Sequence, residues 1–135
     1  MRVVIDTNII ISAAIKDRVP EKVILWITKQ PNISWVISEE ILDEYINVIK
    51  RPKFHLNEKQ ISNWLDLIYQ SVTIVKPFKK IVFSPDKLDA MFIECALFCN
   101  ADYIITGDAH FENIEKEFNV KVINIKEFFD TFVNN

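Results

Sequence analysis

The sequence predicts an α/β fold, a single-domain three-layer α/β/α arrangement around a central parallel sheet of about five strands. Three observations support this prediction. Short apolar runs alternate with segments of helical periodicity, most of those segments are long enough to cross over between parallel strands, and the first run is apolar at every position. The chain has 135 residues, which suits one compact domain spanning residues 1–135.

The expected strands are short runs rich in Val, Ile and aromatic residues. They are residues 3–5, 33–37, 72–75, 103–106 and 120–123. The expected helices are residues 9–15, 22–30 and 39–51, a segment after Asn57 that includes residues 61–68, and residues 85–99 and 126–133.

Residue types at the predicted helix ends agree with these boundaries. Ser38, Asn57 and Ser84 precede helical segments, and their side chains can accept a hydrogen bond from the first turn. Pro20 stands at a first-turn position, and Asn100 suits the left-handed conformation just past a helix end. The helix after Asn57 has one apolar stripe, which consists of Ile61, Trp64, Leu65 and Ile68.

Composition and charge exclude several classes of protein. Apolar residues make up 50% of the chain and charged residues 26%, a balance that excludes intrinsic disorder. Gly107 is the only glycine, so the Rossmann fingerprint and the phosphate loop, which need several, are both excluded. The net charge of −3 argues against a dedicated DNA-binding module, but not against a nucleic-acid enzyme whose carboxylates bind metal.

Cys95 and Cys99, the two cysteines of the chain, are one helical turn apart. Because the sequence shows no signal peptide, we expect reduced core thiols in a cytoplasmic protein. Half of a metal site is the alternative, but the chain has no second cysteine pair, and neither histidine is near in sequence. No apolar run approaches the roughly 18 residues of a transmembrane helix, so we expect no membrane association.

Two aspartates follow predicted strands at their carboxyl ends. Asp6 comes directly after residues 3–5, and Asp108 follows residues 103–106 after Gly107. Because the carboxyl ends of parallel strands form the ligand crevice of an open sheet, both carboxylates are expected at the same edge. Each also precedes a predicted helix, so capping of that helix is the alternative interpretation, and the two interpretations can hold together. The glycine suggests a positive φ or a close backbone approach at residue 107.

Asp89 falls on the apolar face of its predicted helix, between Phe92 and Ile93 on the helical wheel. A buried carboxylate is stable only beside a cation, a metal or hydrogen-bond donors. An ion pair with Lys or Arg is the structural alternative. A divalent cation held by several carboxylates, Mg²⁺ or Mn²⁺, would explain Asp89 together with Asp6 and Asp108.

Four segments carry a pattern that extends over nearly the whole chain. They are residues 3–8 (VVIDTN), residues 38–45 (SEEILDEY) with 51–54 (RPKF), Asp89 with Phe92, and residues 101–108 (ADYIITGD). In this order and spacing they resemble the PIN-domain family of metal-dependent ribonucleases, and within it the toxins of bacterial toxin–antitoxin pairs related to VapC. The resemblance implies a PIN-like fold and hydrolysis of RNA phosphodiester bonds that leaves a 5′-phosphate.

The resemblance also implies a metal site with Mg²⁺ or Mn²⁺ as cofactor. Matched residue by residue, the family's metal-binding acids fall on Asp6, Glu44, Asp89 and Asp108, and the polar residues that line its site fall on Thr7, Asn8 and Thr106. Without the resemblance, Glu44 could not be preferred to Glu39 or Asp43. Residues 84–89 (SPDKLD) depart from the family's pattern, and Asp86 competes with Asp89 as the third acid.

Cations that would contact an RNA substrate form two groups. The first is Lys50, Arg51 and Lys53. The second lies in the long connection before the predicted helix at residues 85–99, where Lys79 and Lys80 accompany Lys76 and Lys87, with Phe78 and Phe83 interleaved. Such a composition can hold a single strand by charge and stacking. A solvated loop whose phenylalanines pack inward is the equally weighted alternative.

Two other classes of protein remain open from the sequence. One is an aspartyl phosphatase or a phosphoacceptor receiver domain, which also places an aspartate after the first strand. Asn8 stands where the phosphatase has a second aspartate, and Asn124-Ile125 stands where the receiver has its lysine. The other class is a PIN fold whose site has decayed and which only binds a partner.

The resemblance implies a small antitoxin protein as partner. Residues 23–27 are all apolar, so the helix at residues 22–30 has more than one apolar stripe. Its excess surface either packs beneath the helix around Trp64 or forms a patch around Trp26. Such a patch would meet an antitoxin segment or, in a homodimer, a second copy.

Overall fold

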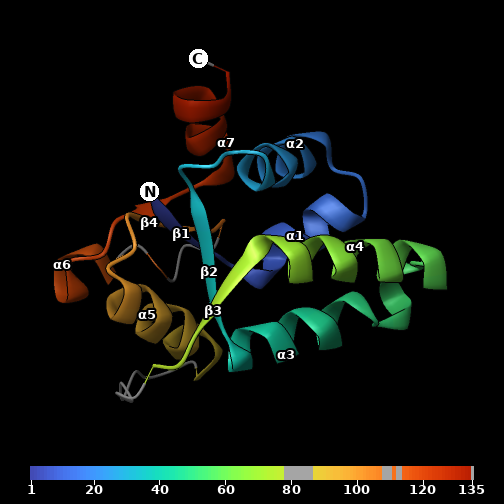
Figure 1. Cartoon of the computed structure of the whole chain (residues 1–135), viewed down its shortest axis with the longest axis horizontal. Coiled ribbons are helices and arrows are strands. Elements are labelled where there is room, and N and C mark those ends of the chain that lie inside the picture. Colours follow the sequence, from blue (N-terminus) through green and yellow to red (C-terminus); the bar gives the residue numbers. More distant parts are fainter. Residues whose placement is uncertain (78–86, 108–110, 112–113, 135) are drawn as a thin grey trace.

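The computed structural model describes residues 1–77, 87–107, 111 and 114–134, with the backbone alone for residues 87–89 and 114. Five strands form one parallel sheet in the order β3-β2-β1-β4-β5 (Figure 1). Their bounds are β1 (Arg2–Ile5), β2 (Ser34–Ser38), β3 (Val72–Val75), β4 (Tyr103–Ile105) and β5 (Val122–Ile123). The predicted parallel sheet is confirmed.

Helices connect these strands. They are α1 (Thr7–Ala14) and α2 (Arg18–Thr28) between β1 and β2, α3 (Glu39–Ile49) and α4 (Glu58–Ser71) between β2 and β3, α5 (Lys87–Cys99) before β4, α6 (Ile114–Phe118) before β5, and α7 (Ile125–Phe128) after β5. A 3₁₀ turn, η1 (Pro52–Phe54), lies between α3 and α4, and a π-helical turn, η3 (Phe129–Val133), follows α7. Within the described residues, none of the helices is both long and apolar enough to cross a membrane.

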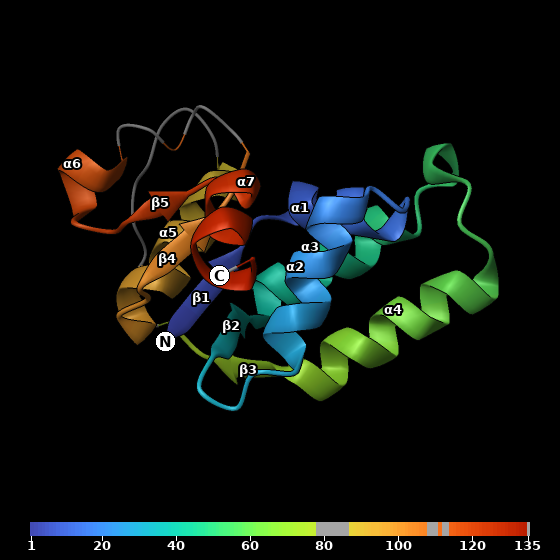
Figure 2. The same cartoon turned by 90° about the horizontal axis from the view of Figure 1, so that it is seen from above.

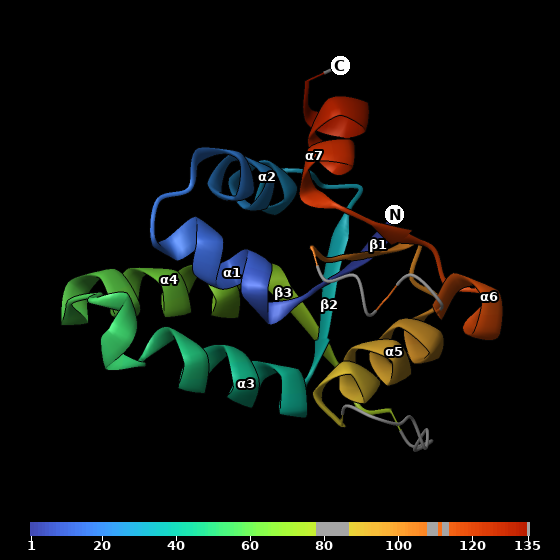
Figure 3. The same cartoon turned by 180° about the vertical axis from the view of Figure 1, so that it is seen from behind.

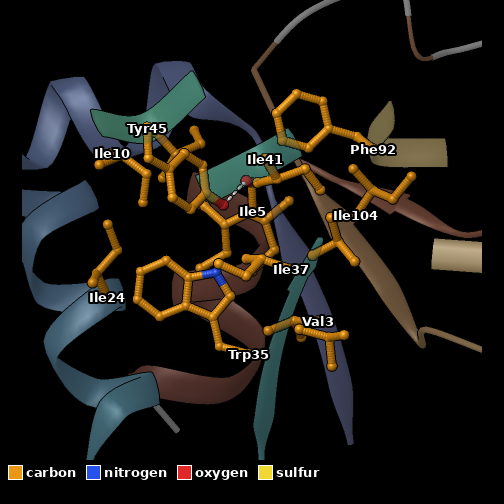
Figure 4. Packing of buried hydrophobic residues seen from close by; sticks show 14 of the residues in the cluster. Val3, Ile5, Ile10, Ile24, Trp35, Ile37, Ile41, Tyr45, Phe92 and Ile104 are labelled. Carbon is orange, nitrogen blue, oxygen red and sulfur yellow. Dashed lines mark hydrogen bonds between the residues drawn. The ribbon is translucent and has the colours of Figure 1, made fainter. Parts of the chain in front are cut away.

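The sheet lies between two helical layers. α1, α2 and α7 pack together in one layer, and α5 packs on β1, β2 and β4 in the other (Figures 1 and 3). Side chains alternate along each strand, so neighbouring strand residues face opposite layers. Ile10 and Ile24 lie with Trp35, and Phe92 lies beside Ile104 (Figure 4). The predicted three-layer α/β/α architecture is confirmed.

α3 and α4 both extend beyond the sheet (Figures 1 and 2). α3 leaves the carboxyl end of β2, and α4 returns the chain to the amino end of β3. Ile68 is the one buried residue of α4, whereas Ile61, Trp64 and Leu65 are half-buried against the core. The predicted apolar stripe therefore faces the core from the periphery of the molecule.

Capping residues fix the helix ends where they were predicted. The Oγ atom of Ser38 accepts a hydrogen bond from the N–H of Ile41 at 3.2 Å. Asn57 and Gln60 form a reciprocal capping box at the start of α4. Asn100 has a φ of 53° just after α5, the left-handed conformation expected there.

Other boundaries differ from the prediction. α2 begins at Arg18, which places Pro20 inside the first turn, where the missing N–H would have no intrahelical partner. The sequence predicts a helix after Asp108 but not its bounds, because α6 is too short to show a helical period. The predicted helix at residues 126–133 divides into α7 and η3, and the predicted cap at Ser84 lies outside the described residues.

Trp26 of α2 packs against the C-terminal segment. Its ring meets Phe128 edge-on at 6.2 Å, and Phe128 also contacts Tyr103 and Phe132. Trp26 is half-buried, and Leu25 beside it is 36% exposed. We expected either the helix around Trp64 or a partner to cover Trp26, and the structure shows a third cover, an aromatic cluster from β4, α7 and η3.

Candidate active site

Asp6 lies at the carboxyl end of β1 with a buried side chain. Its backbone N–H donates to the carbonyl of Ile105 at 2.9 Å, and its Oδ2 atom accepts a hydrogen bond from the Thr106 hydroxyl at 2.8 Å. Asp6 is 6% exposed and Thr106 is 2% exposed. Asp6 occupies the N-cap position of α1, but its side chain makes no capping hydrogen bond. The capping interpretation of Asp6 is therefore wrong, and its carboxylate faces β4.

The strand order places Asp6 at the point of the sheet where ligands bind in open α/β folds. The chain passes from β1 to β2 and β3 on one side, and then to β4 and β5 on the other. The order therefore reverses between β1 and β4, which pair in register through Ile5 and Ile105. The crevice of an open parallel sheet lies outside the carboxyl ends of the strands at such a switch point.

The same strand order decides one of the alternatives. Receiver domains have the flavodoxin-like order, in which β1 lies between β2 and β3. Here β1 lies between β2 and β4. The receiver-domain alternative is therefore wrong.

The polar residues that follow Asp6 differ in exposure. Thr7, the first residue of α1, is 6% exposed, and its Oγ1 atom is buried with no hydrogen-bond partner among the described residues. Asn8 is exposed. A buried hydroxyl without a partner costs free energy. Thr7 is thus a polar group at this edge whose hydrogen-bonding capacity the described protein atoms do not use.

Glu44 and Tyr45 of α3 stand next to each other in sequence, and Tyr45 reaches the same edge. Tyr45 is fully buried, and its hydroxyl donates to the carbonyl of Ile5, the residue before Asp6 (Figure 4). Burial raises the pKa of Tyr45 well above its ordinary value, and the charge of Asp6 acts in the same direction. Glu44 is half-buried. The Tyr45 hydroxyl is therefore a neutral donor held close to Asp6.

The other two predicted acids are described less completely. Asp89 belongs to α5, which packs on β1, β2 and β4, and the residues that share its predicted face are all buried: Phe92, Ile93 and Ala96. The Asp89 side chain, and the whole of Asp86 and Asp108, lie outside the described residues. The assignment of the third and fourth acids remains a prediction.

The side chains that the structure describes fit a divalent cation by their chemistry. Carboxylates such as Asp6 and Glu44 are the hard oxygen ligands that Mg²⁺ and Mn²⁺ prefer. A hydroxyl such as that of Thr7 can hydrogen-bond to a metal-bound water. In the described part of the chain, no three His, Cys, Asp or Glu side chains form a group that could hold a metal ion. Asp6 and Glu44 thus provide part of a site that needs further ligands.

Gly107 does not have the geometry that we expected. The φ of Gly107 is not positive, and a Cβ atom added at this residue would meet nothing within 4 Å among the described atoms. The expectation of a positive φ is wrong, and the described residues make no close approach to Gly107. A side chain at this exposed position beside Thr106 would project into open space.

One buried acid was missed by the sequence analysis. Glu94 of α5 is only 9% exposed, although the helical wheel places it opposite the core-facing Phe92. Periodicity predicts the face of a helix that meets the sheet, but it does not predict what covers the opposite face. No signal in the sequence marked Glu94 as buried.

The first predicted group of cations is exposed at the far end of α3. Lys50, Arg51 and Lys53 are all exposed, and the Lys53 ammonium lies 5.1 Å from the centre of the Phe54 ring. Lys50 is six residues beyond Glu44, about 9 Å along the helix axis. Lys79 and Lys80, with Phe78 and Phe83, lie outside the described residues. RNA contact by either group remains a prediction.

Comparison with known proteins identifies the family. The PIN domain family model matches residues 2–110, so this chain belongs to the PIN domain family. No curated protein sequence matches the chain.

Solved structures show the same fold. A chain in the crystal structure of VapBC2 from Rickettsia felis, bound to a DNA fragment from their promoter, is similar with a TM-score of 0.67 and 21% identity over 92% of this chain and 98% of that one. A chain of VapBC-1 from nontypeable Haemophilus influenzae has a TM-score of 0.64 and 20% identity, over 93% and 99% of the two chains. A PilT N-terminus domain protein from Sulfolobus solfataricus has a TM-score of 0.61 and 19% identity, over 100% and 96%. The PIN-like fold is confirmed.

Proposed function

We propose that this protein is a metal-dependent endoribonuclease that acts as the toxin of a toxin–antitoxin pair. The observation that carries the proposal is Asp6, a buried carboxylate at the switch point of a PIN-family sheet, which accepts a hydrogen bond from Thr106 instead of capping α1. Burial of a charged group costs several kcal/mol unless donors or a cation compensate. A buried carboxylate at the ligand crevice of an open sheet is typical of a functional site.

The metal would be held by Asp6, Glu44, Asp89 and Asp108. Mg²⁺ or Mn²⁺ bound there supplies charge stabilisation at the phosphate and a water of lowered pKa. Thr106 orients the Asp6 carboxylate through its hydroxyl. Thr7 has a buried hydroxyl that is able to donate to a phosphate oxygen or a water. Lys50, Arg51 and Lys53 would hold the RNA backbone by charge, which makes binding of RNA weaker at high salt.

Cleavage of a defined RNA tests this proposal. We expect Mg²⁺- or Mn²⁺-dependent cleavage that leaves 5′-phosphate ends and stops when the metal is chelated. Glu44→Gln removes one carboxylate charge, whereas Asp43→Asn makes the same kind of change at the exposed neighbouring residue and serves as the control. Activity lost in Glu44→Gln and kept in Asp43→Asn supports the assignment. If the wild type neither cleaves RNA nor binds either metal at millimolar concentration, the protein is instead a PIN fold with a decayed site.

The partner that we propose is a small antitoxin protein. The similar structures from Rickettsia felis and Haemophilus influenzae are both VapBC structures. If an adjacent reading frame encodes a small protein, co-expression with it should give a stable complex that suppresses RNA cleavage. A neighbour that neither binds nor inhibits would contradict the toxin role while leaving the nuclease proposal intact.

Self-association is a separate proposal and rests on exposed apolar residues of the α2 layer. Ile15 is 51% exposed and Leu25 is 36% exposed, so part of this apolar surface remains uncovered. A two-fold dimer would bury such a surface against its own copy. Sedimentation at micromolar concentration distinguishes the two states, and a strict monomer would overturn the homodimer.

A further inference from the structure

Tyr45 is a buried polar residue to which the mechanism above gives no role. Its side chain is fully buried, and its hydroxyl reaches across 40 residues of sequence to the carbonyl of Ile5 (Figure 4). A buried hydroxyl that forms a hydrogen bond over such a separation joins two elements that local structure does not hold together. In this molecule, the two elements are α3 and the end of β1.

The hydrogen bond forms where β2 no longer pairs with β1. The pairs between β1 and β2 are Arg2 with Ser34 and Val3 with Trp35, so this ladder ends before β1 does. On the other side, β1 stays paired with β4 as far as Ile5 and Ile105. Tyr45 reaches the carbonyl of Ile5, two residues beyond the last β1–β2 pair. Its ring packs at 6.1 Å from the ring of Trp35.

α3 is thereby anchored to the sheet at two points. Ser38, the last residue of β2, caps the start of α3 through the N–H of Ile41. Tyr45, about two turns further along, joins the helix to the end of β1. Glu44 directly precedes Tyr45 in sequence, and Asp6 directly follows Ile5, whose carbonyl accepts the hydrogen bond from Tyr45. The distance between these two acids therefore depends on the second anchor.

We propose that Tyr45 is a positioning residue, which fixes Glu44 relative to Asp6 and so sets the affinity of this edge of the sheet for a divalent cation. This inference rests on the proposed function, because it requires that Asp6 and Glu44 share a metal. Mg²⁺ demands near-ideal octahedral geometry, so a small displacement of one ligand lowers affinity. Residues that orient metal ligands typically change metal affinity or activity by about 10- to 100-fold when they are replaced.

Tyr45→Phe tests the inference, because it removes one oxygen atom and keeps the packed ring. We expect the Kd for Mn²⁺, measured by titration calorimetry on the full chain, to rise roughly 10-fold. Tyr103→Phe makes the same change in β4, at the opposite edge of the sheet, and should leave the Kd unchanged. Ser38→Ala releases the other anchor and should weaken Mn²⁺ binding by less than Tyr45→Phe. Thermal unfolding of each variant confirms that it is folded at the temperature of the titration.

A double-mutant cycle separates positioning from a general loss of stability. Glu44→Asp keeps a carboxylate but shortens the side chain by one methylene group, so the carboxylate no longer reaches the position of the metal ligand. If Tyr45 acts through Glu44, Tyr45→Phe should change the Kd less than twofold in the Glu44→Asp background. An equal effect in both backgrounds overturns the inference, as does a Kd for Tyr45→Phe within twofold of the wild type. A wild type that binds no Mn²⁺ overturns the proposed function and this inference together.

Discussion

Three polar side chains at the carboxyl edge of the sheet are buried, whereas two charged side chains at the amino edge lie in solvent. Asp6, Thr7 and Thr106 are each at most 6% exposed. At the amino edge, Asp102 and Lys121 are exposed and line an open hollow of about 610 Å³ together with Tyr103 and Phe132. The hollow described at the carboxyl edge, between Ser38 and Pro77, is only about 160 Å³.

The described polar groups of the two edges also differ in what they do. At the amino edge, the Asp102 carboxylate accepts the backbone N–H of Arg2, and the ammonium of Met1 donates to the carbonyl of Asn32. These groups hold chain ends and turns in place at little cost because they remain in water. At the carboxyl edge, the buried Asp6 carboxylate accepts from Thr106, and burial of the Thr7 hydroxyl, which has no hydrogen-bond partner among the described residues, costs free energy. The comparison teaches that the described polar groups of the carboxyl edge are held where burial costs free energy, and this is why we take that edge as the candidate functional edge.

The largest effect is expected from replacing an aspartate at the carboxyl edge, and the same replacement at the amino edge is the control. Asp6→Asn should lower RNA cleavage by about a thousandfold or more, because loss of a metal ligand removes several kcal/mol of charge stabilisation. Asp102→Asn should leave cleavage unchanged, since the amide oxygen can still accept the N–H of Arg2. Initial rates on one labelled RNA measure both. Equal losses of RNA cleavage in the two variants would contradict the claim that the site lies at the carboxyl edge.

A smaller effect is expected when the donor to Asp6 is removed. Thr106→Val keeps the shape of the side chain but leaves a buried carboxylate oxygen without that hydrogen bond. We expect a loss of about 1–3 kcal/mol in the free energy of unfolding and a weaker affinity for Mn²⁺. Thr28→Val, which removes a hydroxyl that donates to Leu25 within α2, is the control and should leave metal binding intact. Urea unfolding and titration calorimetry give the two quantities. Unchanged metal affinity in Thr106→Val would show that Thr106 does not orient the ligand.

Burial of Tyr45 predicts that the wild type and Tyr45→Phe differ at alkaline pH in how steeply the free energy of unfolding falls. Because burial raises its pKa in the folded state, its contribution to stability is fully present below the ordinary value of 10.0 and falls as pH rises beyond it. The wild type should therefore lose free energy of unfolding more steeply above about pH 10 than Tyr45→Phe does. Urea unfolding at a series of pH values measures both slopes. Parallel slopes would contradict the burial of this hydroxyl.

The smallest effect concerns the two free cysteines of α5. Cys95 is buried, whereas Cys99 is half-buried, and its carbonyl accepts a hydrogen bond from the Arg2 guanidinium at the amino edge. A hydrogen bond from the Cys95 thiol lowers the pKa of Cys99, and the charge of Arg2 acts in the same direction. Iodoacetamide should therefore label Cys99 well before Cys95, as peptide mass spectrometry would show. Prior labelling of Cys95 would contradict the burial pattern of α5.

Much of the fold was predictable because local signals and burial agree. Residues 3–5 of β1 are all apolar because both faces of the strand meet helices, and Ser38 and Asn57 cap helices through short-range bonds. The predicted boundaries of helices were wrong where tertiary contacts determine them. The cover of Trp26 comes from Phe128, about a hundred residues away in sequence, and no periodicity reports that contact.

The candidate site was predictable in part for a similar reason. Asp6 stands out because it ends a buried strand, and the order of the strands then places it at the crevice. Glu44 required the family resemblance, because its place at the rim of α3 does not distinguish it from Asp43. The hydrogen bond of Tyr45 to Ile5 depends on how α3 crosses the end of β1, and a tyrosine on an apolar face predicts only burial.

Crystals grown with Mn²⁺ would test the central claim most directly, because anomalous scattering locates the ion without reference to activity. We predict an anomalous peak at the carboxyl edge of the sheet, about 2.1 Å from an oxygen of Asp6 and in contact with the Glu44 carboxylate. The same crystals of Asp6→Asn should lack it. A peak confined to the amino edge beside Asp102, or a fully occupied peak that Asp6→Asn leaves in place, would contradict the claim that Asp6 organises a metal site.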